Sequence, residues 1–543
     1  MAVKPVLENQ SVDGIALCAY ADVRRSLLEK REIAFLDVRE EDPHAQAHPL
    51  FAANFPLSRL ELDAYTKLPR RDVPIVTLDA GDVDLQESDA LLAARRLVAL
   101  GFTQVAVFAG GVRAWQAAGG ELFRDVNVPS KSFGELVEVK KHTPSLSAAQ
   151  VQTLLDQQTD MVIVDVRRFD EYHTMSIPTA ISCPGAELVL RIAELAPDPQ
   201  TMVIVNCAGR TRSIIGTQSL LNAGIPNPVL ALRNGTIGWT LAGQRLEHGA
   251  RREGRHVPLQ NALKAAARAR AVAARAGVKS VDWATLVQWQ AQLDRTTYCF
   301  DTRTLEDYLS GHLPGFRPAP GGQLVQETEM VAPVRGARIV LADLDGVRAN
   351  MSASWLAQMA WDVFVLTGME QADFVQTGAG IIPTSPVPRV PAITVPELVR
   401  GLAAKQLVVL DLAKQAQYLA GHIPAAGYVL RSQFKLALSR LPPAAGYVLV
   451  CPDGLLASFA WAEIAALLAS PVTVLTGGTS AWSAAGLALE QGPTRLFSEP
   501  IDRYQRPYEG RDAPRAAMQA YLDWEAGLVA QLALDGTHHF QVT

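Results

Sequence analysis

Residues 207–213 read Cys207-Ala208-Gly209-Arg210-Thr211-Arg212-Ser213. The stretch follows an apolar run, residues 202–205, that is typical of a short buried strand, and it precedes residues 214–221, which are typical of a helix stopped by Gly224. The pattern therefore places Cys207 on a strand-to-helix turn. The first N–H groups of a helix have no internal partner and favour an anion, so we expect Cys207 to be partly ionised and nucleophilic near neutral pH.

Two arginines of the same turn, Arg210 and Arg212, add positive charge beside the cysteine. Cations lower the pKa of a neighbouring thiol, and an arginine presents a planar fork of donors that suits an oxyanion. We therefore expect both arginines to hold an anionic substrate. The other expected substrate-binding residues are the remaining members of the turn, Ala208, Gly209, Thr211 and Ser213.

The turn resembles the active-site loop of the rhodanese (sulfurtransferase) family. The resemblance also rests on Asp165-Val166-Arg167 upstream and on Asn234-Gly235-Thr236-Ile237-Gly238-Trp239 downstream. It implies that Cys207 is the catalytic cysteine. Such a cysteine accepts a sulfane sulfur as a persulfide from a donor such as thiosulfate and passes it to a thiophilic acceptor, cyanide or a thiol, without a cofactor.

Three alternative functions stay open at this point. A cysteine phosphatase uses a similar loop but needs five residues between cysteine and arginine, whereas four separate Cys207 from Arg212. An arsenate reductase normally also needs a resolving cysteine, for which Cys183 is the one candidate. A non-catalytic scaffold or binding protein has no reason to keep Cys207 beside two arginines.

Internal repeats organise the chain. A strand ending in aspartate recurs four times, at Asp37, Asp165, Asp301 and Asp411. A second strand and turn follow each aspartate after 42, 42, 42 and 40 residues, at Asp79, Cys207, Asp343 and Cys451. The regular spacing indicates four copies of one fold.

Short apolar runs alternate with helical patterns in every copy, which favours an α/β fold with a mainly parallel sheet and helices on both faces. We expect four tandem rhodanese-like domains with ligands bound at the carboxyl ends of the strands. The expected boundaries are 1–135, 136–255, 280–380 and 381–495 for the domains, 256–279 for a helical linker and 496–543 for a helical tail that packs against one of the domains.

The four turns differ in chemistry. The first and third have Asp79 and Asp343 in place of the cysteine and cannot form a persulfide, so we expect inactive domains in which the aspartates cap a helix. The fourth keeps Cys451, a candidate second site. However, Pro452 removes a backbone donor, Asp453 adds a like charge and Leu456 replaces the arginine, all of which favour a buried core cysteine.

Other residues of the second copy are expected to be structural. We predict that Asp165 and Arg167 form an ion pair between the sheet edge and the loop, that Trp239 fills the core, and that His173 has no catalytic role. The cysteines at positions 18, 183 and 299 are predicted to be packing residues.

Composition excludes several classes of function. The 543-residue chain carries a net charge of −5, which offers no positive field for a nucleic acid. The first residues lack the pattern of a signal peptide, and no uncharged apolar run approaches the ~20 residues of a membrane span, so no membrane partner is expected. Five cysteines without a Cys-x-x-Cys pair or metal-ligand spacing favour a reducing cytoplasm and no metal. The oligomeric state is not predicted.

Overall fold

The computed structural model describes residues 11–254, 256–380, 383–509 and 513–543, and within them the strands form four sheets. We number the units by their strands in chain order: unit 1 contains β1–β6, unit 2 β7–β11, unit 3 β12–β17 and unit 4 β18–β22. The predicted α/β class with tandem repeats of one fold is confirmed. The expected boundaries at residues 1, 255 and 381 lie outside the described residues.

Unit 2 shows the common plan most simply. Its sheet has the order β7-β11-β10-β8-β9, and all neighbouring strands are parallel. The strands are β7 (Ser145–Leu146), β8 (Met161–Asp165), β9 (Ile181–Ser182), β10 (Met202–Asn206) and β11 (Val229–Leu232). The helices are α7 (Ala148–Asp156), α8 (Phe169–Thr174), α9 (Leu188–Leu195), α10 (Thr211–Asn222) and α11 (Gly235–Leu241), with a 3-10 turn, η3 (Gly185–Glu187).

Helices cover both faces of this sheet because alternate residues of a strand point to opposite sides. Val203 and Val205 of β10 join one core cluster with Leu188 of α9. Ile204, between them, joins a second cluster with Val151 of α7. The central strand β10 is therefore buried on both faces, which explains its uninterrupted apolar sequence.

Units 3 and 4 have the same strand order as unit 2. In unit 1 the same order is formed by β2, β6, β5, β3 and β4. The strands of unit 1 are β1 (Ser11–Val12), β2 (Ile15–Cys18), β3 (Ile33–Asp37), β4 (Ala53–Asn54), β5 (Ile75–Leu78) and β6 (Val105–Phe108). Those of unit 3 are β12 (Lys279–Val281), β13 (Thr297–Asp301), β14 (Arg317–Pro318), β15 (Val334–Arg335), β16 (Arg338–Ala342) and β17 (Asp362–Leu366). Those of unit 4 are β18 (Ala392–Ile393), β19 (Leu407–Asp411), β20 (Gly427–Tyr428), β21 (Gly446–Val450) and β22 (Val472–Leu475).

The helices of these units flank the sheets in the same manner. Unit 1 has α1 (Tyr20–Leu28), α2 (Glu41–Gln46), α3 (Leu60–Lys67), α4 (Asp89–Ala99) and α5 (Gly111–Ala117). Unit 3 has α13 (Trp283–Gln290), α14 (Leu305–Ser310), α15 (Gly321–Gln326), α16 (Thr328–Val331) and α17 (Arg348–Gln358). Unit 4 has α18 (Val395–Ala403), α19 (Gln415–Ala420), α20 (Phe434–Ala437), α21 (Leu455–Ala465) and α22 (Gly478–Ala484). The short 3-10 turns are η1 (Leu57–Arg59), η2 (Leu85–Glu87), η4 (Gln371–Asp373), η5 (Arg431–Gln433) and η6 (Leu438–Arg440).

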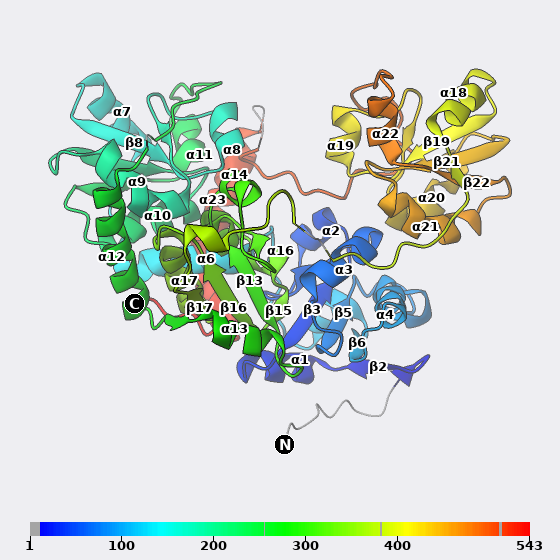
Figure 1. The fold of residues 1–543 in the computed structure, drawn as a ribbon, viewed down its shortest axis with the longest axis horizontal. Helices are drawn as coiled ribbons and strands as arrows, with labels where there is room; N and C mark the ends of the chain where they lie inside the picture. Colours follow the sequence, from blue (N-terminus) through cyan, green and yellow to red (C-terminus); the bar gives the residue numbers. More distant parts are fainter. Residues whose placement is uncertain (1–10, 255, 381–382, 510–512) are drawn as a thin grey trace.

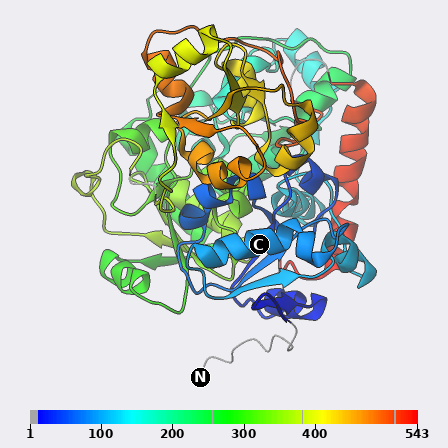
Figure 2. The same cartoon turned by 90° about the vertical axis from the view of Figure 1, so that its right-hand side faces the viewer.

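Three long helices connect or cover the units. Helix α6 (Val128–Lys141) leads from unit 1 to unit 2 and spans the boundary expected at residue 135. Helix α12 (Leu259–Arg275) lies where a linker helix was expected and packs on α9 and α17. Helix α23 (Arg515–Asp535) belongs to the tail, and it packs along α6 and reaches α11 of unit 2 (Figures 1 and 2).

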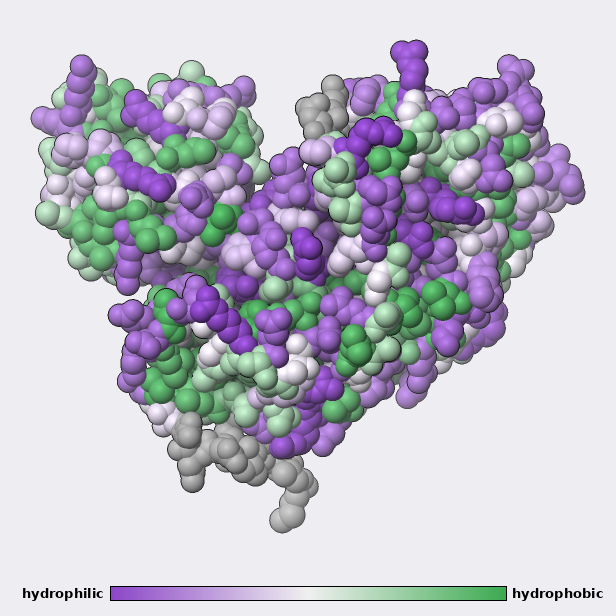
Figure 3. All heavy atoms as spheres, turned by 180° about the vertical axis from the view of Figure 1, so that it is seen from behind, coloured by the Kyte–Doolittle hydropathy of each residue, from purple (hydrophilic) through white to green (hydrophobic). Residues whose placement is uncertain are grey.

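The four units are not independent domains joined only by linkers. Strand β15 of unit 3 leaves its own sheet and pairs antiparallel with β3 of unit 1, so these two units share a seven-stranded sheet. Unit 4 forms a separate lobe, with a notch between it and the rest of the molecule (Figures 1 and 3). It contacts unit 1 through Arg431, whose guanidinium donates to both carboxylate oxygens of Glu61 at 2.7 and 3.0 Å. In the described part of the chain, no helix is both long and apolar enough to cross a membrane.

Candidate active site at Cys207

Cys207 lies where the sequence predicted, between the carboxyl end of β10 and the first turn of α10. The side chain is buried, with 1% of its surface exposed. The sheet therefore presents this cysteine at the edge where ligands of open α/β sheets bind.

The backbone of the turn is supported by the N-terminus of α11. The N–H groups of Thr236 and Ile237 donate to the carbonyl oxygens of Cys207 and Ala208, both at 2.9 Å. The close approach requires glycine at position 235, where φ is +52° and an added Cβ would lie 2.3 Å from the Cys207 carbonyl oxygen. The downstream glycine motif thus fixes the shape of the cysteine turn.

Ser213 contacts the sulfur directly. The Cys207 Sγ lies 3.4 Å from the Ser213 Oγ, and that hydroxyl donates to the Arg210 carbonyl oxygen at 2.9 Å. A hydroxyl has a single proton to donate. The neutral thiol therefore donates to Ser213, and a thiolate would receive the serine proton only after the hydroxyl turned away from Arg210.

The two arginines are already paired with carboxylates. Arg212 donates to both oxygens of Glu171 at 2.8 and 2.9 Å. Arg210 donates to both oxygens of Glu135 at 2.7 and 2.8 Å and also contacts Glu138. In this structure neither arginine presents its full charge to a substrate, so the expected binding of an anionic substrate by both arginines stays a prediction.

The thiol is also less acidic than the sequence suggested. Burial raises the pKa of Cys207, while Arg212 and hydrogen bonds from Ser213 oppose that rise without cancelling it. The prediction of a partly ionised cysteine is therefore wrong for this closed form of the site. The main physical reason is burial of the thiol, and the arginine that opposes the rise is itself paired with Glu171, whose pKa burial alone would raise but which Arg212 lowers to about 2.

The tail covers the site, which sequence spacing could not show. A cavity of about 20 Å³ at the cysteine turn is lined by Lys131 of α6, Tyr508, Tyr521 and Glu525. Tyr521 donates to one oxygen of Glu525 at 2.9 Å, and the other oxygen, Oε2, is buried without a hydrogen-bond partner among the described residues. Burial raises the pKa of Glu525 to about 8, with Lys131 opposing the rise. The carboxyl beside the cysteine turn is thus neutral at pH 7.

The corresponding turns of units 1 and 3 hold an aspartate in place of the thiol. Asp79 accepts hydrogen bonds from the N–H groups of Gly81 and Ala90, both at 3.0 Å, and Asp343 likewise accepts from Gly346 and Ala349 at 3.0 and 2.8 Å. Both aspartates cap their turns, as predicted.

Cys451 of unit 4 belongs to the core of its unit and has 1% of its surface exposed. Burial raises the pKa of this thiol to about 11, and Asp453, whose Oδ1 lies 3.6 Å from the sulfur, adds to the rise. The geometry therefore favours the packing interpretation over a second site.

The residues predicted to be structural lie in positions that fit a structural role. Arg167 donates to both oxygens of Asp165 at 2.9 and 2.8 Å, and Trp239 is fully buried. His173 contacts the carbonyl oxygen of Ala250 and lies outside the cavity at Cys207. All five cysteines are free and buried, and the described residues contain no group of three or more His, Cys, Asp or Glu side chains that could hold a metal ion.

Comparisons with known proteins agree with the repeated fold. The family model for the rhodanese-like domain matches residues 21–118, 147–242 and 394–485, which together exceed half of the chain. The crystal structure of a thiosulfate sulfurtransferase from Pseudomonas aeruginosa is 62% identical, with a TM-score of 0.95 over 97% of this chain and 100% of that chain. The HTH-type transcriptional regulator Rv0324 from Mycobacterium tuberculosis is 33% identical over 91 residues, and the match spans 17% of this chain and 39% of that relative.

Replacing Gly235 by alanine tests the support of the cysteine turn. The new Cβ would both strain a positive φ and collide with the Cys207 carbonyl oxygen, so we expect a loss of stability of about 3 kcal/mol or more. Gly243→Ala is the matched control, because Gly243 also has a positive φ but no atom within 4 Å of an added Cβ, and it should cost about 1 kcal/mol. Thermal unfolding of both variants measures the difference, and equal losses would contradict the proposed contact.

Replacing Glu525 by glutamine tests the buried neutral carboxyl. Because the folded protein holds the proton up to about pH 8 while an unfolded glutamate releases it near 4.5, the stability of the wild type should fall between these values as pH rises. The glutamine variant lacks this ionisation, so its stability relative to the wild type should increase by ~2 kcal/mol or more from pH 5 to pH 9. Thermal unfolding across that range gives the comparison. Asp523→Asn, at an exposed position of the same helix, should follow the wild type, and a parallel course for Glu525→Gln would exclude the raised pKa.

Proposed function

Since this chain belongs to the rhodanese family, we propose that it is a sulfurtransferase that moves a sulfane sulfur from thiosulfate or a similar anion to a thiophilic acceptor through a persulfide on Cys207. The observation that carries the proposal is the Cys207 turn itself. It joins the carboxyl end of a central parallel strand to a helix N-terminus, with four residues between the cysteine and Arg212. The similar protein from Pseudomonas aeruginosa, which the chain matches over nearly its whole length, is named a thiosulfate sulfurtransferase.

The first half-reaction begins with transfer of the Cys207 proton to solvent. The thiolate attacks the outer sulfur of thiosulfate, a bond forms between the two sulfurs, and the sulfur–sulfur bond of the donor breaks with its electron pair leaving on sulfite. Arg212 is the cation whose charge lowers the thiol pKa, and it therefore favours the attacking form.

The size of the closed cavity supports a persulfide intermediate. A space of about 20 Å³ accommodates roughly one water-sized group and is too small for thiosulfate. One additional sulfur on Cys207 would fit there. Donor entry then requires displacement of the covering side chains, chiefly Tyr508 and Tyr521.

The second half-reaction regenerates the enzyme. A nucleophilic acceptor attacks the outer sulfur of the persulfide, and the bond between the two sulfurs breaks with its electron pair returning to Cys207. Cyanide would leave as thiocyanate, and a thiol as its own persulfide. Two separate steps divided by a covalent intermediate give ping-pong kinetics.

We assign the sulfur-carrying role to unit 2 alone, with units 1, 3 and 4 as supporting domains. The expected boundaries of 1–135, 136–255, 280–380 and 381–495 belong to this proposal, with α6 shared between the first two. Five free cysteines fit a reducing compartment, and we place the protein in the cytoplasm.

The sulfur carrier can be identified by intact-mass spectrometry before and after thiosulfate, and again after cyanide. We expect the wild type to gain the mass of one sulfur atom, which cyanide removes, and Cys207→Ser to gain none. Cys451→Ser is the matched control and should behave as the wild type, because Asp453 adds to the rise of the Cys451 pKa, whereas Arg212 opposes the rise at Cys207. No gain under any donor would contradict the enzyme, and two sulfurs would assign Cys451 a second site.

The electrostatic role of Arg212 is tested by a pair of substitutions with opposite effects. Arg212→Ala removes the cation that favours the thiolate, so kcat/KM for thiosulfate should fall roughly 10- to 150-fold, the equivalent of ~1.5–3 kcal/mol for a charge-assisted contact. Glu171→Gln leaves the arginine but removes its carboxylate partner, so the pKa of Cys207 should fall. The pH dependence of Cys207 alkylation measures both changes, and an unchanged profile in Arg212→Ala would contradict this role.

A further inference from the structure

We propose that the cavity between units 2 and 3 binds the sulfur acceptor, and that this acceptor is an organic thiol with an apolar body. The inference rests on the sulfurtransferase function proposed above and goes on to specify the class of thiol. It depends on the size and walls of the cavity, on the polar side chains gathered at one end, and on the residues it shares with the cavity at Cys207.

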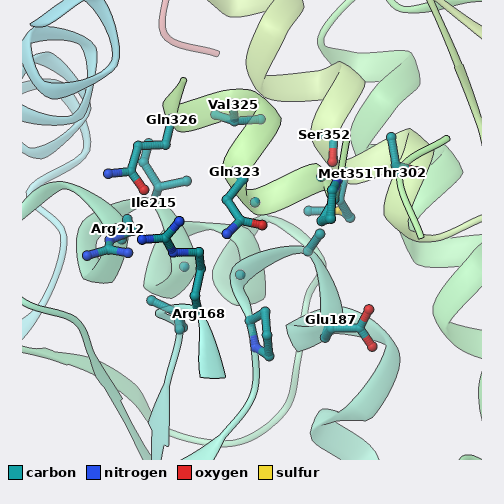
Figure 4. A pocket seen from close by; sticks show the side chains of 18 of the residues that line it. Arg168, Glu187, Arg212, Ile215, Thr302, Gln323, Val325, Gln326, Met351 and Ser352 are labelled. Atoms are coloured by element: carbon teal, nitrogen blue, oxygen red, sulfur yellow. The ribbon is translucent and has the colours of Figure 1, made fainter. Parts of the chain in front are cut away.

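The cavity has a volume of about 550 Å³, which lies in the range of sites for small organic ligands. Its walls come from both units: η3 and α10 of unit 2, and α15 and α17 of unit 3 (Figure 4). Most of the lining is apolar, from Phe133, Val166, Ile215, Val325, Met351 and Trp355. A small hydrophilic dianion such as thiosulfate gains nothing from such walls, whereas an apolar chain gains by leaving water.

One end of the cavity is polar. Figure 4 shows Arg168, Arg212, Gln323 and Gln326 gathered on one side, with Met351 and Ser352 on the opposite side. The side-chain amides of Gln323 and Gln326 make no hydrogen bond within the described part of the chain, and the Arg168 guanidinium has only long ion contacts, 3.6 Å to Asp170 and 3.5 Å to Glu171. These donors and acceptors suit an amide or an anionic thiolate at the head of an otherwise apolar ligand.

The polar end lies against the sulfur site. Thr211, Arg212 and Gln326 line both the large cavity and the small cavity that contains Cys207. A ligand with its tail among Met351 and Trp355 therefore directs its head toward the residues that border the persulfide. Cyanide is too small to use the apolar walls, so the cavity distinguishes among thiols rather than between thiols and cyanide.

The transfer step is balanced without another reactant. The acceptor thiolate attacks the outer sulfur of the Cys207 persulfide, a new sulfur–sulfur bond forms, and the bond to the Cys207 sulfur breaks with its electron pair remaining on Cys207. The acceptor leaves as R–S–SH. One proton is lost from R–SH and one is taken up by the Cys207 thiolate, so the number of protons is unchanged.

The test compares two acceptors with the same head, mercaptoacetamide and N-hexyl-mercaptoacetamide, in the full-length enzyme loaded with thiosulfate. We expect kcat/KM to be at least about tenfold higher for the hexyl compound, because its chain is buried in the cavity. Cyanide serves as the acceptor that needs no cavity.

Gly185→Leu places a bulky side chain in the cavity with little strain. An added Cβ at Gly185 has no atom within 4 Å, and η1, the turn of unit 1 that likewise follows a proline, begins with Leu57 where η3 begins with Gly185. The variant should lose the preference for the hexyl compound while keeping the rates with mercaptoacetamide and cyanide. Gly527→Leu is the matched control, since an added Cβ there also meets no atom and the residue is exposed outside the cavity, and it should keep the preference.

Calorimetric binding of N-hexylacetamide, which carries no sulfur, separates this proposal from the function on which it rests. We expect binding to Cys207→Ser and a loss of binding when Gly185→Leu is added. Equal kcat/KM for the two thiols, or a preference that survives Gly185→Leu, would overturn the acceptor site even if transfer to cyanide is normal. Failure of transfer to every acceptor, cyanide included, would instead overturn the sulfurtransferase function, and the acceptor assignment with it.

Discussion

A buried carboxylate at the end of a strand holds the cysteine turn in place. Asp165 ends β8 and is fully buried, where an unpaired charge would be costly. Arg167 offsets that cost with two hydrogen bonds and also donates to the Met175 carbonyl oxygen, and Asn206, the residue before Cys207, donates to Asp165 at 2.9 Å. One ion pair thus joins two neighbouring strands and the loop after them. The position of the sulfur depends on this network because Cys207 directly follows Asn206.

The repeats show what this ion pair contributes. Asp37 with Arg39 and Asp301 with Arg303 form the same bidentate contact in units 1 and 3, although neither unit carries a cysteine at its turn. The pair therefore serves the fold rather than the chemistry. Unit 4 has Ala413 in the arginine position, and burial raises the pKa of Asp411 to about 6. This unit keeps the aspartate for the hydrogen bond from the Ala413 N–H, at 2.9 Å, and does without the compensating charge.

The sequence predicted what depends on local spacing and failed where distant segments meet. The strand repeats, the capping aspartates, the Asp165–Arg167 pair and the place of Cys207 follow from residues within one repeat. Glu135, Glu171 and Glu525 reach the turn from α6, α8 and α23, and nothing near position 207 announces them. Missing these carboxylates and the burial of the thiol led to the wrong expectation of a partly ionised Cys207. The sequence also showed no sign that Cys207 is buried, because the tail that covers the site begins some three hundred residues later.

The charges around Cys207 are already paired with one another in this structure. Each nearby cation already has an anion: Arg212 has Glu171, Arg210 has Glu135, and Lys131 has Asp125 at 2.7 Å. A thiosulfate dianion added to this set would have to replace a carboxylate as the partner of an arginine. Exchange of that kind leaves the displaced carboxylate without its cation, so its cost includes rearrangement of the ion pair as well as movement of the covering tail. The protonated Glu525 limits the repulsion at this place, since an ionised carboxylate there would repel both an anionic donor and a Cys207 thiolate.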